Sequence, residues 1–221
     1  MNIATPLSLM IRRLVRNFLR TLMKGRDVLR HRKELATFLN FRNRTQPGFE
    51  GSVQPEELEF LSELVRRSNA FDGPIIEVGT LFGFTTQAMA GWKMNGKELI
   101  SIDDYSWNPL GLAPLAHRDF AVRSLHYIRQ NCDVTLFEGP STQFCASYDG
   151  PTPAMIFIDA SHEYEHVLTD ITWARQKGVP IIAGHDYSAF WPGVKRAVDE
   201  SFGSAITVYG TLWAHVNQGA S

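Results

Sequence analysis

In this 221-residue chain, polar and glycine residues lie at the end of one short apolar run and directly after it. The run Pro74–Val78 contains Glu77 and is followed by Gly79 and Gly83. Glycines at such a turn let the backbone pass close to a ligand, because they have no Cβ atom. In a parallel α/β sheet, a turn of this kind at the carboxyl end of a strand binds nucleotide-type ligands. We therefore expect a ligand site here, with the Glu77 carboxylate facing a cationic or hydroxyl-bearing group.

Other apolar runs also end in residues that can do chemistry. The carboxyl ends of parallel strands meet at one edge of the sheet, so these residues should converge there. A histidine with a pKa near 6.5 accepts a proton at neutral pH, and carboxylates on strands about 4.8 Å apart can share one cation. The residues are Asp103 and Asp104, Glu138, Gly139 and Ser141, Asp159 and His162, and His185, Asp186 and Tyr187.

The turn lacks two common phosphate-binding patterns. It has no third glycine, which disfavours the dinucleotide fingerprint G-x-G-x-x-G, and no Gly-Lys-Ser/Thr follows, which excludes a P-loop. Asp103 lies at the end of the next apolar run, where an acid commonly accepts hydrogen bonds from a ribose diol. An acid-rich pocket of this kind suits a ligand with a ribose, an adenine and a positive charge. S-adenosylmethionine (SAM) is such a ligand.

The elements that position these residues alternate between strands and helices from residue 55 onward. This alternation predicts an α/β fold with a doubly wound, mostly parallel, seven-stranded sheet. The apolar runs 74–78, 154–158 and 180–183 are continuous, as expected for strands with helices on both faces. We expect strands at 74–78, 98–102, 134–138, 154–158, 180–183, 205–209 and 212–217, and helices at 55–68, 84–92, 116–131, 141–148, 162–177 and 194–202.

Charge divides the chain into a basic arm, residues 1–45, and a domain, residues 46–221. The arm has eleven Lys and Arg residues against Asp27 and Glu34, although the whole chain has a formal net charge of −1. Apolar residues recur in it at helical spacing with arginines between them, which predicts an amphipathic helix. Three interpretations stay open: a helix packed on its own domain or on a second subunit of a homo-oligomer, a peripheral helix on anionic lipid, and an organellar transit peptide.

Cysteine content and charge indicate the cellular compartment of the protein and the kinds of partner it can bind. Two cysteines, Cys132 and Cys145, do not form a disulfide framework, so we expect a cytoplasmic protein, with peripheral membrane contact through the arm still open. No nucleic-acid reader motif accompanies the basic charge, which disfavours a nucleic-acid partner.

Three motifs together resemble a known enzyme family. Glu77-Val78-Gly79-Thr80 with Gly83 resembles motif I of class I SAM-dependent methyltransferases. Residues 157–165 and 183–187 resemble the strand-four and strand-five motifs of small O-methyltransferases, typified by the macrocin and mycinamicin sugar enzymes and their cephalosporin-biosynthesis relatives. The resemblance covers residues 50–217 and implies methylation of a hydroxyl on a sugar, a glycan or another small-molecule natural product.

The resemblance also implies roles for single residues. In the cofactor site, Glu77, Gly79, Thr80 and Gly83 would line the methionine end, Asp103 would bind the ribose, and Glu138, Gly139 and Ser141 would lie beside the adenine. Asp159 and Asp186 would hold a divalent cation, and His162 would be the general base. His185 stands where metal-dependent relatives often have an acid, which weakens the case for Mg²⁺ and favours a softer ion such as Mn²⁺.

Other interpretations of these residues stay open. Asp159 and Ser161 would also suit the N-cap of a following helix, and His185 would suit a packed position behind the site. His162-Glu163-Tyr164-Glu165-His166 matches the H-E-x-x-H pattern of zinc hydrolases, which counts only if both histidines lie on one helix. A SAM-binding module without catalysis is a further alternative.

Overall fold

The chain folds around a seven-stranded sheet with the order β3-β2-β1-β4-β5-β7-β6. The computed structural model describes residues 53–54 and 56–217. Strands β1 to β5 pair in parallel, and β7 is antiparallel to both β5 and β6. The predicted α/β class and the doubly wound, mostly parallel sheet of seven strands are therefore confirmed. The predicted arm, residues 1–45, lies outside the described residues. Within the described part, no helix is long and apolar enough to cross a membrane.

The elements follow one another in the predicted alternation. The strands are β1 (Ile75–Val78), β2 (Leu99–Asp103), β3 (Val134–Glu138), β4 (Met155–Ile158), β5 (Ile181–Gly184), β6 (Thr207–Tyr209) and β7 (Leu212–Val216). The helices are α3 (Leu58–Ser68), α4 (Phe84–Trp92), α5 (Pro114–Ser124), α6 (His126–Asn131), α7 (Ser141–Ser147), α8 (Tyr164–Gln176) and α9 (Pro192–Phe202).

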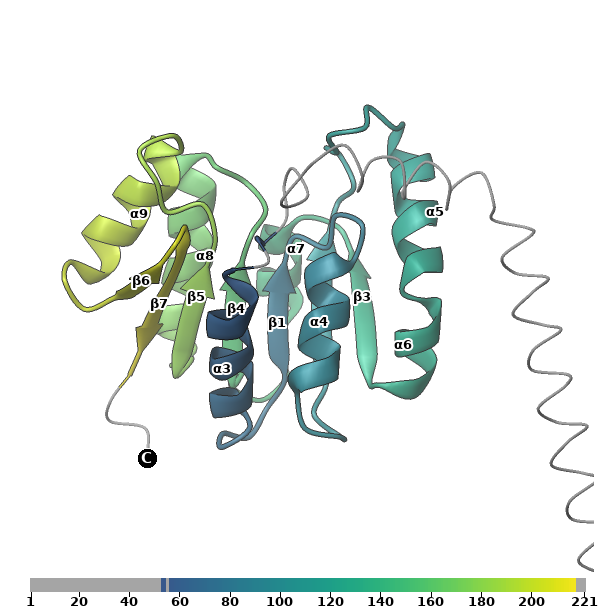
Figure 1. Ribbon diagram of the computed structural model, residues 1–221, viewed down its shortest axis with the longest axis horizontal. Helices are drawn as coiled ribbons and strands as arrows, with labels where there is room; N and C mark the ends of the chain where they lie inside the picture. Colours follow the sequence, from purple (N-terminus) through teal and green to yellow (C-terminus); the bar gives the residue numbers. More distant parts are fainter. Residues whose placement is uncertain (1–52, 55, 218–221) are drawn as a thin grey trace, which may run out of the picture. The chain divides into compact units, whose positions relative to one another are not determined.

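Helices cover both faces of the sheet, with α3 and α4 in front and α7 and α8 behind in Figure 1. Successive strand residues enter opposite cores, as the two-residue period of a strand requires. Ile75 packs in the cluster with Leu61 of α3 and Met89 of α4, whereas its neighbour Ile76 packs in the cluster with Ile171 of α8. Burial on both faces explains why β1, β4 and β5 are continuous apolar runs in the sequence.

Two helices differ from the sequence-based prediction in ways that bear on the site, and α3 and α9 begin at Leu58 and Pro192 instead of residues 55 and 194. The predicted helix 116–131 is two helices, α5 and α6, that meet at Leu125. Leu125 is fully buried and fills the space that a Cβ atom at Gly83 would enter, so packing against the β1–α4 turn fixes the chain at this point. Helix α8 begins at Tyr164 instead of His162, because Glu163 has an extended backbone. His162 therefore lies in the β4–α8 loop.

Candidate active site at the carboxyl edge of the sheet

The turn after β1 is pressed against the end of β4. Gly79 has a φ of 104°, and a Cβ atom there would collide with the backbone carbonyl of Asp159. Gly83 has a φ of 83° and stands at the N-cap of α4. Both glycines are thus required by the backbone, since L residues with a side chain rarely adopt these conformations. The contact brings the predicted cofactor turn next to the predicted catalytic residues.

The Asp103 carboxylate lies under this turn. Its Oδ2 accepts hydrogen bonds from the backbone N–H groups of Thr80 and Leu81, at 2.9 and 2.7 Å. Its Oδ1 accepts one from the N–H of Tyr105, at 2.7 Å. A carboxylate has about four lone-pair positions, so Oδ1 retains capacity for one more donor. Asp103 thus ties the ends of β1 and β2 together and still has room for a ligand hydroxyl.

Glu77 is buried beneath the turn instead of facing its surface. Its Oε2 accepts hydrogen bonds from the hydroxyls of Thr86, at 2.5 Å, and Ser101, at 2.6 Å. Its Oε1 is buried without a hydrogen-bond partner among the described residues. Burial, reinforced by the charges of Asp159 and Asp103, raises the pKa of Glu77 to about 8. Glu77 therefore offers no open surface at the turn, and its predicted place at the methionine end of the cofactor stays a prediction.

Replacing Glu77 by glutamine should flatten the pH dependence of stability. Between pH about 4.5 and about 8 the folded protein binds more protons at Glu77 than the unfolded chain does, so the free energy of unfolding falls as pH rises. Glutamine keeps an acceptor for Thr86 and Ser101 but does not titrate. Urea unfolding from pH 5.5 to 8 should show a slope shallower by up to about 1.4 kcal/mol per pH unit in Glu77→Gln.

The exposed Glu98→Gln change, which removes a negative charge just before β2, serves as its control. Equal slopes for Glu77→Gln and the wild type would contradict the assignment of a raised pKa to Glu77.

The residues after β3 lie at the same edge but have partners of their own. Glu138 forms a two-pronged ion pair with Arg118 of α5, with both N–O distances at 2.6 Å. Gly139 donates its N–H to the carbonyl of Asp103 at 2.9 Å, which joins the ends of β2 and β3. The Ser141 side chain hydrogen-bonds to the buried Asp170 of α8. The predicted adenine contacts of Glu138, Gly139 and Ser141 stay a prediction.

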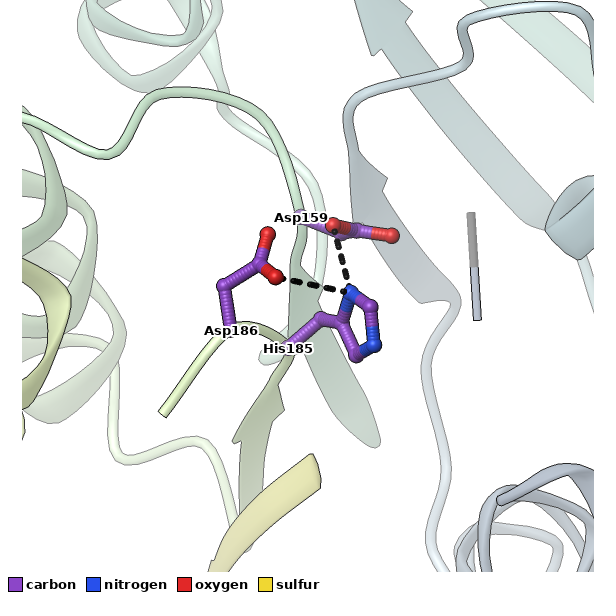
Figure 2. A group of neighbouring side chains, drawn as sticks. All are labelled: Asp159, His185 and Asp186. Carbon is purple, nitrogen blue, oxygen red and sulfur yellow. Dashed lines mark ion pairs between the residues drawn. The ribbon is translucent and has the colours of Figure 1, made fainter. Parts of the chain in front are cut away.

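Asp159, His185 and Asp186 form a compact cluster at the ends of β4 and β5, in which His185 is buried and the two carboxylates are half-buried (Figure 2). One ligand atom from each lies within 4.8 Å of the others. Nδ1 of His185 faces both carboxylates, at 3.4 Å from Asp159 Oδ1 and 3.6 Å from Asp186 Oδ1. A cavity of about 10 Å³ borders all three residues, which is room for one water-sized species. Because the Asp159 side chain points into this cluster, the interpretation as a helix cap does not apply to it.

A fourth residue of the cluster, Glu57, was missed by the sequence analysis. It lies just before α3, and its Oε2 is 3.0 Å from Nε2 of His185. Burial acts to raise the pKa of Glu57, but hydrogen bonds from His185, Thr211 and Gln54 outweigh it and lower the pKa to about 2. Burial acts to lower the pKa of His185, but Asp159, Glu57 and Asp186 outweigh it and raise the pKa to about 11. The ring of His185 is thus held among three carboxylates.

His162 lies beside the cluster and is held on two sides. Its Nε2 is 2.8 Å from Asp186 Oδ2, and its ring stacks on Trp191, with centroids 3.6 Å apart and planes 11° apart. If Nε2 carries the proton donated to Asp186, Nδ1 is left as the basic nitrogen. Asp186 therefore faces His185 with one oxygen and His162 with the other. Its φ of 62° is in the left-handed region, which is uncommon for a residue with a side chain.

The two histidines of the H-E-x-x-H pattern do not face each other. His162 precedes α8 and binds Asp186, whereas His166 is inside α8 and has its Nδ1 at 2.9 Å from Ser161 Oγ. A zinc hydrolase needs both histidines on one face of one helix, so this arrangement disfavours that interpretation.

The strand order, with an antiparallel seventh strand inserted beside β5, is that of class I methyltransferases. A family model described as a methyltransferase domain matches residues 76–187, about half of the chain. The chain therefore belongs to this methyltransferase family. The matched segment runs from the β1 turn to the residues after β5 and so includes both halves of the site. A search of curated proteins gave no significant match.

Solved structures with the same fold include three methyltransferases. A candidate O-methyltransferase from Klebsiella pneumoniae has a TM-score of 0.58 and 26% identity, covering 75% of this chain and 82% of its own. The O-methyltransferase from Bacillus cereus, in complex with SAH, has a TM-score of 0.60 and 19% identity, covering 84% and 91%. CalS11, a TDP-rhamnose 3′-O-methyltransferase of calicheamicin biosynthesis, has a TM-score of 0.56 and 16% identity, covering 74% and 79%.

Proposed function

We propose that the protein is a SAM-dependent O-methyltransferase that methylates a hydroxyl group of a sugar, a glycan or a glycosylated natural product. The observation that carries this proposal is the pairing of His162 with Asp186, in the loop that begins at Asp159, the residue that packs against Gly79 of the β1 turn. The Klebsiella protein and CalS11, which are similar in fold, are described as O-methyltransferases, and CalS11 acts on a sugar nucleotide.

The cofactor half of the site fits SAM in three respects. Gly79 and Gly83 leave the backbone of the turn accessible, and Asp103 has acceptor capacity for a ribose hydroxyl. The carboxylates of Asp103 and Asp159 lie beside the turn and favour a sulfonium cation. Glu138, Gly139 and Ser141 follow β3 at the same edge, on the side where we place the adenine.

His162 is the proposed general base. In methyl transfer, the acceptor oxygen forms a bond to the methyl carbon as the carbon–sulfur bond breaks, and a neutral thioether, SAH, leaves. The acceptor proton moves to Nδ1 of His162, and Asp186 stabilises the resulting imidazolium through Nε2. Stacking on Trp191 fixes the plane of the ring, which favours the orientation that in-line displacement requires.

The cluster of Asp159, His185 and Asp186 fits a divalent cation. Nδ1 of His185 is buried and has no hydrogen-bond partner among the described residues, and it is directed at two carboxylates beside a cavity of one-ion size. Asp159, His185 and Asp186 would hold the ion. A bound Mg²⁺ or Mn²⁺ would lower the pKa of a coordinated hydroxyl and orient it.

Removing divalent cations should abolish methyl transfer if this ion takes part. Enzyme treated with EDTA and then desalted is expected to lose activity, and added Mn²⁺ or Mg²⁺ should restore it, while SAH binding stays unchanged. Full activity after EDTA treatment, with no metal detected by elemental analysis, would remove the ion from the proposal and leave His162 as the sole activating group.

Aromatic side chains beside His162 are candidates for the acceptor site. Phe190 is 78% exposed and packs edge-on against Trp191, with ring centroids 4.8 Å apart. Exposed aromatic faces suit the apolar faces of sugar rings.

The proposal includes a small-molecule or glycan acceptor and a cytoplasmic location. It also includes contacts of residues 1–45 with lipid or with a second subunit.

The experiment that tests the proposal is transfer of an isotope-labelled methyl group from SAM to a panel of sugars, sugar nucleotides and glycosylated compounds. The expected product carries the label on oxygen. Label on nitrogen or carbon would contradict the O-specificity. SAM binding without transfer to any acceptor of the panel would favour a SAM-binding module without catalysis.

A further inference from the structure

The Glu57 carboxylate has every acceptor position filled. Oε1 accepts from the backbone N–H and the hydroxyl of Thr211, at 2.5 and 3.0 Å. Oε2 accepts from the N–H of Gln54, at 3.0 Å, and lies 3.0 Å from Nε2 of His185. Four donors on one buried carboxylate match its four lone-pair positions. The side chain is therefore fixed in place and ionised.

The backbone is shaped around Glu57. A Cβ atom at Gly210, in the turn between β6 and β7, would collide with the Glu57 carboxylate, and Gly210 has a φ of 62°. The same turn supplies the two donors of Thr211. Three segments far apart in the sequence therefore converge on one carboxylate: the start of α3, the β6–β7 turn and the residue after β5.

The consequence for His185 is a single ring orientation. Glu57 accepts the hydrogen of Nε2, so Nδ1 is the nitrogen directed at Asp159 and Asp186 (Figure 2). The residue is 6% exposed, and Nδ1 has no hydrogen bond to any described residue. This buried ring nitrogen, directed into the two carboxylates beside a cavity of water size, is the atom that an ion would bind in place of the ring proton.

We propose that Glu57 is a positioning residue of the cation centre, which holds His185 so that its Nδ1 ligates the ion and makes the centre select a transition ion such as Mn²⁺ over Mg²⁺. This inference rests on the cation of the proposed function. A carboxylate that orients a ligating histidine through its other nitrogen is a recurrent arrangement in metal sites. Imidazole nitrogen suits transition ions, whereas Mg²⁺ prefers oxygen ligands only.

The test is binding of Mn²⁺ to the purified chain without SAM, followed by electron paramagnetic resonance. Glu57→Gln keeps the size of the side chain but offers one acceptor oxygen in place of two. We expect it to weaken Mn²⁺ binding by about 10- to 100-fold. The matched control is Thr211→Val, which removes one donor to Glu57 and leaves the contact with His185, and it should change the affinity by less than about threefold. Equal affinities of Glu57→Gln and the wild type would overturn the proposal.

A second measurement on the wild type does not depend on how the variants fold. Pulsed electron paramagnetic resonance of bound Mn²⁺ should detect coupling to a ring nitrogen, and Mg²⁺ should displace Mn²⁺ only at a large excess. Bound Mn²⁺ without nitrogen coupling, or displacement by equal Mg²⁺, would overturn the proposal. Nitrogen-coupled Mn²⁺ in a protein that transfers no methyl group would contradict the proposed function and leave this inference intact.

Discussion

Replacing Asp103 by asparagine is expected to weaken binding of SAM and of SAH to the same extent. Asparagine has one acceptor oxygen, and the backbone N–H groups of Thr80, Leu81 and Tyr105 already require both oxygens of Asp103. The amide thus cannot satisfy the turn and accept from a ribose hydroxyl. Loss of a hydrogen bond to a charged group costs about 1.5–3 kcal/mol, so both dissociation constants should rise roughly 10- to 150-fold.

Asp104, the residue after Asp103, offers a matched control. Asp104 has the same chemistry one residue later, but its side chain is exposed and accepts from the N–H of Ser106 within its own loop. Calorimetric titration of Asp104→Asn should give affinities close to those of the wild type. If Asp103→Asn weakened the binding of SAM but not that of SAH, Asp103 would interact with the sulfonium charge and not with the ribose.

Replacing His162 by glutamine is expected to lower kcat by about 10²- to 10⁴-fold, the usual contribution of a general base. Glutamine can still donate to Asp186 but cannot accept a proton at neutral pH. SAM and SAH affinities should stay within about twofold, because the His162 side chain contacts Asp186 and Trp191 and not the β1 turn. Single-turnover transfer of labelled methyl groups measures the chemical step directly.

The control for His162 is the second histidine of the H-E-x-x-H pattern. His166→Gln removes a histidine four residues away that pairs with Ser161 instead of the cluster. We expect wild-type kcat for this variant. If the wild-type chain held zinc and His166→Gln lost both the zinc and the activity, the assigned base would be wrong and the hydrolase interpretation would return.

The strands of the sheet were predicted well from the sequence, because central strands that are buried on both faces consist almost entirely of apolar residues. Ile75–Val78, Met155–Ile158 and Ile181–Gly184 are buried at every position, so each stands out as an apolar run. Strand-end residues were predictable for the same reason, since a parallel sheet brings the carboxyl ends of its strands to one edge. Asp103, Asp159 and Asp186 were found in this way without any knowledge of their contacts.

Contacts between distant segments were not predictable. Glu57 lies 128 residues before His185, and nothing in its local sequence distinguishes it from the exposed Glu56 beside it. The break between α5 and α6 depends on packing of Leu125 against Gly83, which no helical period encodes. The partners of Glu77 were also hidden, because a strand-end acid can face the ligand edge or, as here, the hydroxyls of Thr86 and Ser101.

The central claim is that the β1 turn, with Asp103 beneath it, is a SAM site. Equilibrium dialysis of the intact chain against labelled SAM, with unlabelled SAH as competitor, tests it most directly. We predict one SAM bound per chain and complete displacement by SAH. No retained label at millimolar SAM, or label that SAH does not displace, would contradict the claim.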